Sequence, residues 1–182
     1  MSFSAIPSSR HFQVDVLTEH YHFMATLDPH GVLVNYLNHP DRATMPLKQV
    51  TATALYTGSI LTAFKAEELF IRRNEIIALR LSDKLSSETM PLLPRKEKLR
   101  VFLPRFVVQA DFHCGVDTQP GDLFDAMTSY WAIATDALVH SLIHATSPVF
   151  HEAAVLLVNR RHVRFYQTVT APAGGAGKEP LA

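Results

Sequence analysis

Two stretches of the sequence share one pattern. Residues 69–79 read LFIRRNEIIAL, and residues 156–166 read LLVNRRHVRFY. Each has apolar residues, then a polar patch with arginines, then an apolar finish, and their starts lie 156 − 69 = 87 residues apart. We interpret them as the last hairpin of one folding unit, written twice, with apolar ends that close a core and arginine turns that face outward.

Further positions indicate an internal duplication. The alternating apolar residues of 21–27 correspond to those of 106–112 with an offset of 106 − 21 = 85, and residues 35–38 (NYLN) correspond to 122–125 (DLFD) with an offset of 122 − 35 = 87. The order of these positions is the same in both halves, and the offset is nearly constant. Chance similarity would scatter the offset, so the chain is expected to contain two repeats.

Composition bounds the class of protein. The chain has 182 residues, 47% hydrophobic and 19% charged, which is typical of a soluble globular protein. Lys plus Arg and Asp plus Glu both number 17, so the chain lacks the basic surplus of a general nucleic-acid binder, although a local basic patch is still compatible with it. Zero net charge favours association, so the expected partners are further copies of the chain or another protein.

The N-terminal sequence and the single cysteine bear on location. The start MSFSAIPSSR lacks the apolar core of a signal peptide, and no apolar run of about 18 residues follows. A lone Cys114 excludes an intrachain disulfide and fits a small buried residue. We therefore expect a cytoplasmic protein without a membrane segment.

Five segments are expected along the chain. Residues 82–97 (SDKLSSETMPLLPRKE) mix charges, serines and prolines, which is typical of a linker, and both ends are rich in small or polar residues. The predicted order is a disordered N-terminus (1–10), a first small β-barrel repeat (11–81), a linker (82–97), a second small β-barrel repeat (98–169) and a disordered tail (170–182).

The repeats are expected to consist of short strands. Phe12, Val14 and Val16 alternate with polar residues, which is the period of a half-buried strand. The remaining expected strands lie near 20–27, 44–56, 67–81, 99–103, 105–113, 130–142 and 153–167, with a short helical turn at 121–128. The alternative for 121–142 is a helix. The predicted fold is mainly all-β, with two tandem small SH3-like or Sm-like barrels, because closure removes unpaired sheet edges.

The order of motifs resembles the Sm-like small β-barrel. The segments 68–81 (ELFIRRNEIIALRL) and 155–167 (VLLVNRRHVRFYQ) lie where the second motif of that family would lie, and 41–50 (DRATMPLKQV) resembles the end of its first motif. The pieces HYHFMATL (20–27) and NYLN (35–38) are similar to uncharacterised bacterial Sm-like domains. The resemblance implies two tandem barrels, self-assembly, and RNA binding as a family activity.

The sequence departs from the RNA-binding pattern of that family. Pro46 stands where its asparagine is expected, and Arg73 and Arg160 stand where its glycine would fall. Glycine permits a positive φ that arginine resists. The nucleotide pocket of the family is therefore not transferred to this chain.

The candidate binding residues are arginines in the two equivalent turns, which could form a basic strip for phosphates or acidic partners. The competing interpretation is a set of solvated turn residues paired with Glu67, Glu68 and Glu75. The candidates are Arg72, Arg73, Arg160, Arg161 and Arg164, with Arg80 nearby.

A polar pair recurs in both repeats, as Asn35 with Asn38 and as Asp122 with Asp125. It is either a binding site after the turn or a set of caps for short helical turns.

Other chemistry has weaker signals. His20 and His22 share one strand face, with His113 in the corresponding region, but two ligands supply half of a metal site. No catalytic motif is present, so we expect no enzyme, no catalytic residue, no metal and no cofactor. The favoured function is a non-enzymatic interaction or scaffold protein that self-assembles through strand edges, and the alternative is an Sm-like RNA- or nucleotide-binding protein.

Overall fold

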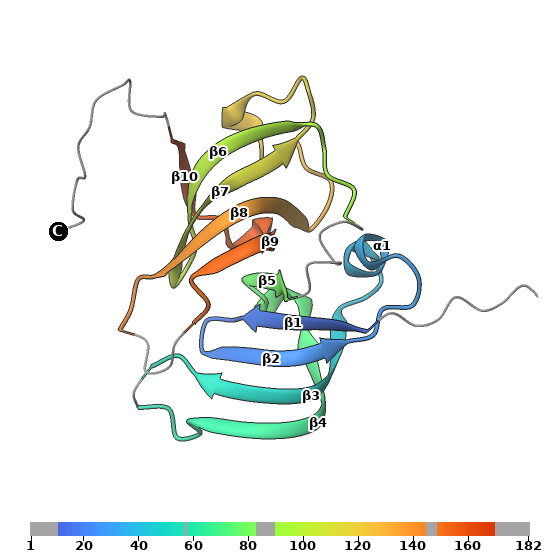
Figure 1. Ribbon diagram of the computed structural model, residues 1–182, viewed down its shortest axis with the longest axis vertical. Helices are drawn as coiled ribbons and strands as arrows, with labels where there is room; N and C mark the ends of the chain where they lie inside the picture. Colours follow the sequence, from blue (N-terminus) through green and yellow to red (C-terminus); the bar gives the residue numbers. More distant parts are fainter. Residues whose placement is uncertain (1–10, 57, 83–89, 145–148, 170–182) are drawn as a thin grey trace, which may run out of the picture.

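The chain folds into a single antiparallel sheet of ten strands (Figure 1). The structure is a computed structural model, and it describes residues 11–56, 58–82, 90–144 and 149–169. The elements in chain order are β1 (Phe12–Leu17), β2 (Tyr21–Leu27), α1 (Leu33–Asn38), β3 (Thr44–Ala54), β4 (Ala63–Arg72), η1 (Arg73–Glu75), β5 (Ala78–Leu81), β6 (Arg95–Phe102), β7 (Phe106–Cys114), η2 (Pro120–Asp122), β8 (Trp131–Ser141), β9 (Glu152–Asn159), η3 (Arg160–His162) and β10 (Phe165–Thr168). The all-β prediction is confirmed.

The strand order divides the sheet into two groups of five. It runs β10-β6-β7-β8-β9-β5-β1-β2-β3-β4. The first group, β1 to β5, has the order β5-β1-β2-β3-β4, and the second group, β6 to β10, has the same relative order, β10-β6-β7-β8-β9. The groups join where β5 pairs with β9, and this contact is called the junction below. The outer edges of the sheet are β4 and β10.

A bulge bends each group at the same place. The pairing register shifts between Met24 and Thr26 opposite β3, and between Gln109 and Asp111 opposite β8. The extra residues, Gln49 and Asp136, have φ of 51° and 52° and lie 136 − 49 = 87 residues apart. A bulge increases the local twist, so each group curls around its own apolar face.

Two hydrophobic clusters fill the curled groups, and each crosses the junction. The first consists mainly of residues from β1 to β5 and α1, together with Trp131, Val155 and Leu157 from the second group. The second consists mainly of residues from β6 to β9, together with Leu17 and Ile77 from the first. Because each hydrophobic cluster includes side chains from both groups, the two groups pack as one unit.

The twin stretches form corners, so the prediction of a final hairpin is wrong. β4 pairs only with β3, whereas β5 pairs with β1 and β9. Between β4 and β5 the chain makes the 3-10 turn η1 and then buries Ile76 and Ile77 completely. Two consecutive buried residues carry the chain across the core to the opposite edge of its group. The single strand predicted over 153–167 is likewise divided, in this case by η3.

Other boundaries differ more modestly from those predicted. β6 begins at Arg95, so residues 95–97 belong to a strand, and Met90 packs into the first core with 6% exposure. The helical turn expected at 121–128 is the short η2 with the turn that follows it, and 130–142 is a strand as predicted. The predicted disordered ends (1–10 and 170–182) and part of the predicted linker (83–89) lie outside the described residues.

Candidate functional site

Three of the candidate arginines surround one cavity. Arg160, Arg161 and Arg164 line an open cavity of about 330 Å³ beside β10, called the arginine cavity below. Its remaining lining residues are Phe124, Asp125, Val163, Phe165 and Tyr166. The site therefore combines positive charge with aromatic surface.

Backbone and side-chain hydrogen bonds hold the walls of the arginine cavity. Arg160 Nη1 donates to the carbonyl of Phe124 over 3.2 Å, and the Tyr166 hydroxyl donates to the carbonyl of Gly121 over 2.6 Å. The rings of Phe124 and Tyr166 meet edge to face at 4.9 Å. Burial raises the pKa of the Tyr166 hydroxyl, and the nearby Asp125 and Asp122 raise it further, so this wall stays a neutral donor.

The charge of the arginine cavity is poorly balanced. Within the described part of the chain, Arg160, Arg161 and Arg164 form no ion pair, and Asp125 is the acid in the lining. Guanidinium groups bind carboxylates and phosphates through paired N–H donors and stack on flat rings. The arrangement is suited to an anionic ligand that carries a planar ring.

Arg73 is placed differently from the outward position predicted for it. It is 6% exposed and donates to the carbonyls of His39, at 2.6 Å, and Arg42. Its guanidinium also lies 4.8 Å from the ring centre of Tyr130, and that of Arg161 lies 4.5 Å from the same centre. Burial lowers the pKa of Arg73, and although Tyr130 opposes this, the net shift is downward. Arg73 is a structural donor, so the solvated-turn interpretation is wrong for it.

The remaining candidate arginine lies elsewhere. Arg72 is the exposed last residue of β4, at the free edge of the first group. The structure therefore brings together Arg160, Arg161 and Arg164, but it does not assemble all five arginines into a strip.

The repeated polar residues do not act as the predicted helix caps. Asn35 and Asn38 lie within α1, whose N-cap is Val32 without a side-chain bond. Asn38 Oδ1 instead accepts the backbone N–H of Tyr130 over 3.0 Å, across the two groups. Asp122 lies in η2, which also lacks a side-chain cap, and Asp125 lines the arginine cavity.

Asn159 is a key residue that the sequence did not reveal. It is fully buried, and its Nδ2 donates to the carbonyls of Arg73 (3.2 Å) and Ile76 (2.9 Å). Its Oδ1 accepts the backbone N–H of Arg161 over 3.1 Å. The available signal was an asparagine ending an apolar run where the first stretch has an arginine. Through these hydrogen bonds, Asn159 connects the segment of η1 to η3.

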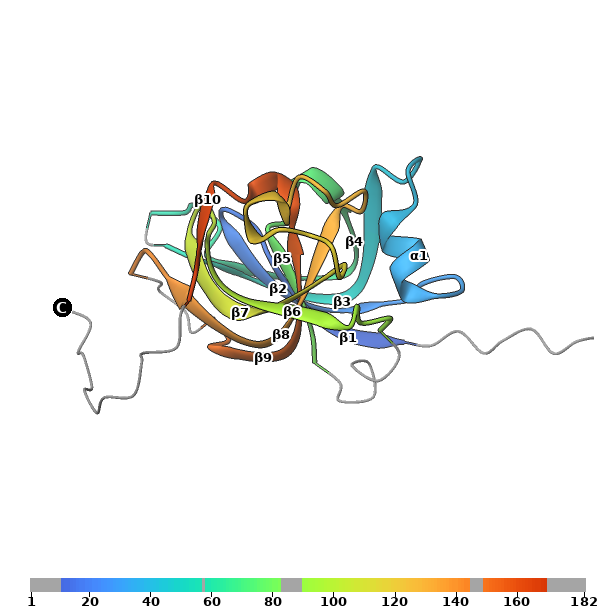
Figure 2. The ribbon, with the colours of Figure 1, turned by 90° about the horizontal axis from the view of Figure 1, so that it is seen from above.

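Two further bonds join the groups near Asn159. Trp131 Nε1 donates to the carbonyl of Leu37 over 3.2 Å, and His162 Nε2 lies 2.6 Å from the carbonyl of Asn74. Figure 2 shows the two 3-10 turns side by side at the top of the molecule, η1 in green and η3 in red. The junction is therefore held by polar contacts at its end as well as by strand pairing.

A second buried polar cluster was also missed. Asp15 is 4% exposed; it contacts His22 Nε2 at 2.8 Å, and accepts bonds from Arg80 at 2.6 and 2.9 Å and from the Ser82 hydroxyl at 2.9 Å. Burial alone would raise the pKa of Asp15, but the bonds from His22, Arg80 and Ser82 outweigh it and hold the pKa below its ordinary value. Arg80, the additional candidate cation, is therefore engaged by a carboxylate.

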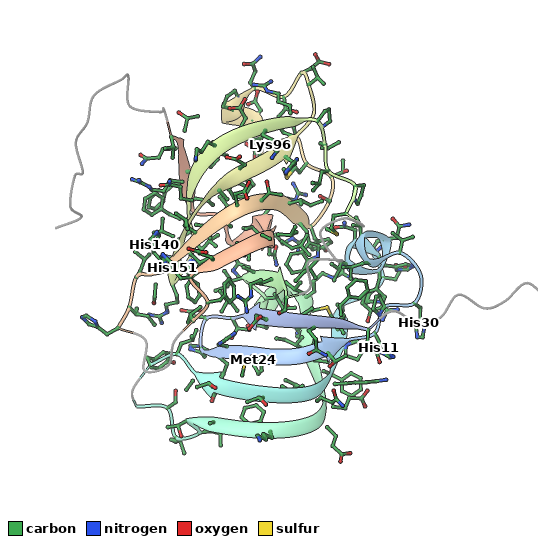
Figure 3. The ribbon with its side chains drawn as sticks, in the orientation of Figure 1. His11, Met24, His30, Lys96, His140 and His151 are labelled. Atoms are coloured by element: carbon green, nitrogen blue, oxygen red, sulfur yellow. The ribbon has the colours of Figure 1, made fainter. Side chains whose placement is uncertain are left out.

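The histidines and the cysteine are dispersed. Nδ1 of His113 lies 2.8 Å from the carbonyl of Leu93. The rings of His140 and His151 meet edge to face, with ring centres 4.8 Å apart (Figure 3). Across the ranges described, no three His, Cys, Asp or Glu side chains are close enough to hold a metal ion. Cys114 is 2% exposed and its pKa is raised by burial, which disfavours the nucleophilic thiolate.

Comparisons with family models, with curated proteins and with solved structures found no match to this chain. Among the described residues, no helix has the length and apolar character needed to cross a membrane.

Proposed function

We propose that the chain is a non-enzymatic interaction or scaffold protein made of two Sm-like repeats, which self-assembles through the edge strands β4 and β10. The observation that carries the proposal is the junction. There, the fourth strand of the second group (β9) pairs with the fifth strand of the first group (β5). The two strands with a free edge are the fourth of the first group, β4, and the fifth of the second, β10. A neighbouring copy can therefore repeat the same contact.

The internal junction supplies a register for the contact between copies. Ala78 lies opposite Val158, and Leu79 opposite Leu157. β10 begins 165 − 78 = 87 residues after β5, and β9 ends 159 − 72 = 87 residues after β4. The equivalent pairing sets Phe165 of one copy opposite Ile71 of the next, and Tyr166 opposite Phe70.

The side chains at both edges favour such a contact. Phe70 on β4 is 64% exposed and Phe165 on β10 is 59% exposed, which is unusual for phenylalanine in a water-facing strand. Unpaired edges with apolar side chains are templates for strand addition. Because the contact joins two different edges, repetition produces a closed ring or a filament.

Light scattering on a sizing column tests the assembly. The wild-type chain is expected to elute as an oligomer, whereas Phe70→Glu and Phe165→Glu should each be monomeric. Mixing the two variants leaves one intact β10 edge and one intact β4 edge, so the mixture should form a heterodimer and nothing larger. Val116→Glu, which changes another exposed apolar residue (68%), is the matched control and should assemble normally. A monomeric wild-type chain would contradict the proposal.

The second candidate function is binding of RNA or a nucleotide, and the arginine cavity favours it. Its three guanidinium groups suit a phosphate, and Phe165, the exposed aromatic residue of its lining, suits a base. In fluorescence anisotropy with labelled single-stranded RNA, an Arg160/Arg161/Arg164→Ala variant should lose affinity and the salt dependence of binding. The control removes the same charge from exposed lysines elsewhere, as Lys65/Lys96/Lys98→Ala. Equal affinity of both variants would exclude the arginine cavity as the site.

A further inference from the structure

A small cavity lies where α1 meets the second five-stranded group. It has a volume of about 140 Å³, and its apolar walls include Val34 and Leu37 from α1, Leu93 ahead of β6, and Ile133 and Leu157 from β8 and β9. Both groups and the segment between them contribute to it. The cavity is therefore a product of the way the two groups pack.

The histidine on its wall is already saturated with hydrogen bonds. His113 Nδ1 lies 2.8 Å from the carbonyl of Leu93, and Nε2 lies 3.1 Å from the hydroxyl of Thr135. A carbonyl oxygen only accepts, so Nδ1 carries a proton, and Nε2 is bonded to the Thr135 hydroxyl. Because both ring nitrogens have partners, His113 offers a ligand no free ring nitrogen.

The other polar side chains on the wall are engaged as well. Ser129 Oγ donates to the carbonyl of Trp131 over 2.8 Å, and Trp131 Nε1 donates to the carbonyl of Leu37 over 3.2 Å. Asn38 Oδ1 accepts the N–H of Tyr130 over 3.0 Å. A ligand that competed for these donors and acceptors would displace the bonds, whereas an apolar ligand leaves them intact.

The size of the cavity narrows the class of ligand. The cavity is partly open to solvent, since Leu93 in its lining is 50% exposed, and its walls are mostly apolar. Apolar cavities of about 150 Å³ are large enough to bind benzene or xenon. We propose that this cavity is a binding site for a small uncharged apolar molecule, a single aromatic ring or a short alkyl group. The molecule would lie against Trp131, which is 3% exposed and is the one tryptophan of the chain. This site goes beyond the proposed assembly and does not depend on β4 or β10.

The probe for the test is benzene, with benzoate as a charged ring of similar shape. Titration of the full-length chain with benzene should change the Trp131 fluorescence in a saturable way and raise the melting temperature, because a ligand that binds the folded state stabilises it. NMR should show contacts between benzene protons and the indole of Trp131. Benzoate at the same concentrations should do neither.

A matched pair of variants locates the site. Val34→Phe should fill the cavity and abolish the response to benzene, whereas Val32→Phe, at a residue that is 58% exposed and outside the lining, should leave it unchanged. Should Val34→Phe not fold, the indole–benzene contact in the wild-type chain still decides. Absence of that contact, or an unchanged response in folded Val34→Phe, would overturn the proposal.

Discussion

Replacing Asn159 with alanine removes side-chain hydrogen bonds that connect the two groups beside the junction. The side chain is fully buried at the end of β9 and makes three hydrogen bonds to the backbone, two as donor and one as acceptor. In Asn159→Ala the carbonyl of Arg73 keeps the bond from the N–H of Ile76. The carbonyl of Ile76 and the N–H of Arg161 lose the partners that Asn159 supplied.

The size of the effect follows from those three bonds. A neutral hydrogen bond contributes about 1 kcal/mol, and a buried group left without a partner costs roughly 1–3 kcal/mol. The expected loss in the free energy of unfolding is therefore about 3 kcal/mol. With a denaturant slope of about 2 kcal/mol per molar urea, the unfolding midpoint should fall by about 1.5 M.

Urea unfolding, followed by both far-ultraviolet circular dichroism and Trp131 fluorescence, measures this shift. Two probes are needed because Trp131 lies directly opposite Asn159 in the pairing of β8 with β9. Asn74→Ala is the control: its side chain is exposed, and it should shift stability by no more than about 0.5 kcal/mol. If Asn159→Ala unfolds at the same urea concentration as the control, the side chain does not hold the junction, and the reasoning is refuted.

Three further predictions concern other buried groups. Because the pKa of Asp15 in the folded chain lies below its ordinary value, the ionised carboxylate stabilises the folded state at neutral pH. This contribution to the free energy of unfolding is lost as the pH falls from about 4 towards the lower pKa, and acid unfolding of Asp15→Asn should lack this pH dependence. Arg73→Lys should lower stability in thermal melts by about 1–2 kcal/mol, since lysine cannot reproduce two carbonyl bonds and the stack on an aromatic ring, whereas the exposed Arg72→Lys should be nearly neutral. Cys114 should react with a thiol reagent only as fast as the chain opens, so its labelling rate should rise with urea; rapid labelling without urea would show that the thiol is accessible.

The strands were predictable because their signal is local. Alternation of apolar and polar residues, as in Phe12, Val14 and Val16, reflects which face of a strand meets the core, and this depends on near neighbours alone. The same holds for 105–113 and 130–142, which match β7 and β8 closely. The bulge residues Gln49 and Asp136 were not predictable, because neither is the glycine that usually marks a positive φ.

Part of the candidate site was also visible in the sequence. Arg160, Arg161 and Arg164 were singled out from their turn, and close sequence spacing places them around one cavity. Arg73, at the equivalent position of the first stretch, is buried instead, because the carbonyls of His39 and Arg42 reach it from a distant loop. Equivalent sequence positions therefore have different environments, since only one of the two groups carries α1.

The amino-acid sequence alone specified an all-β chain with two similarly patterned halves. Only the folded chain shows that β5 pairs with β9 and not with β4, its predicted hairpin partner. It also shows that each hydrophobic cluster includes side chains from both groups, and that Asn159 and Trp131 form hydrogen bonds between the groups. Strand pairing depends on backbone groups, which every residue supplies, so its partners are chosen by how the whole chain packs and not by any short stretch of sequence.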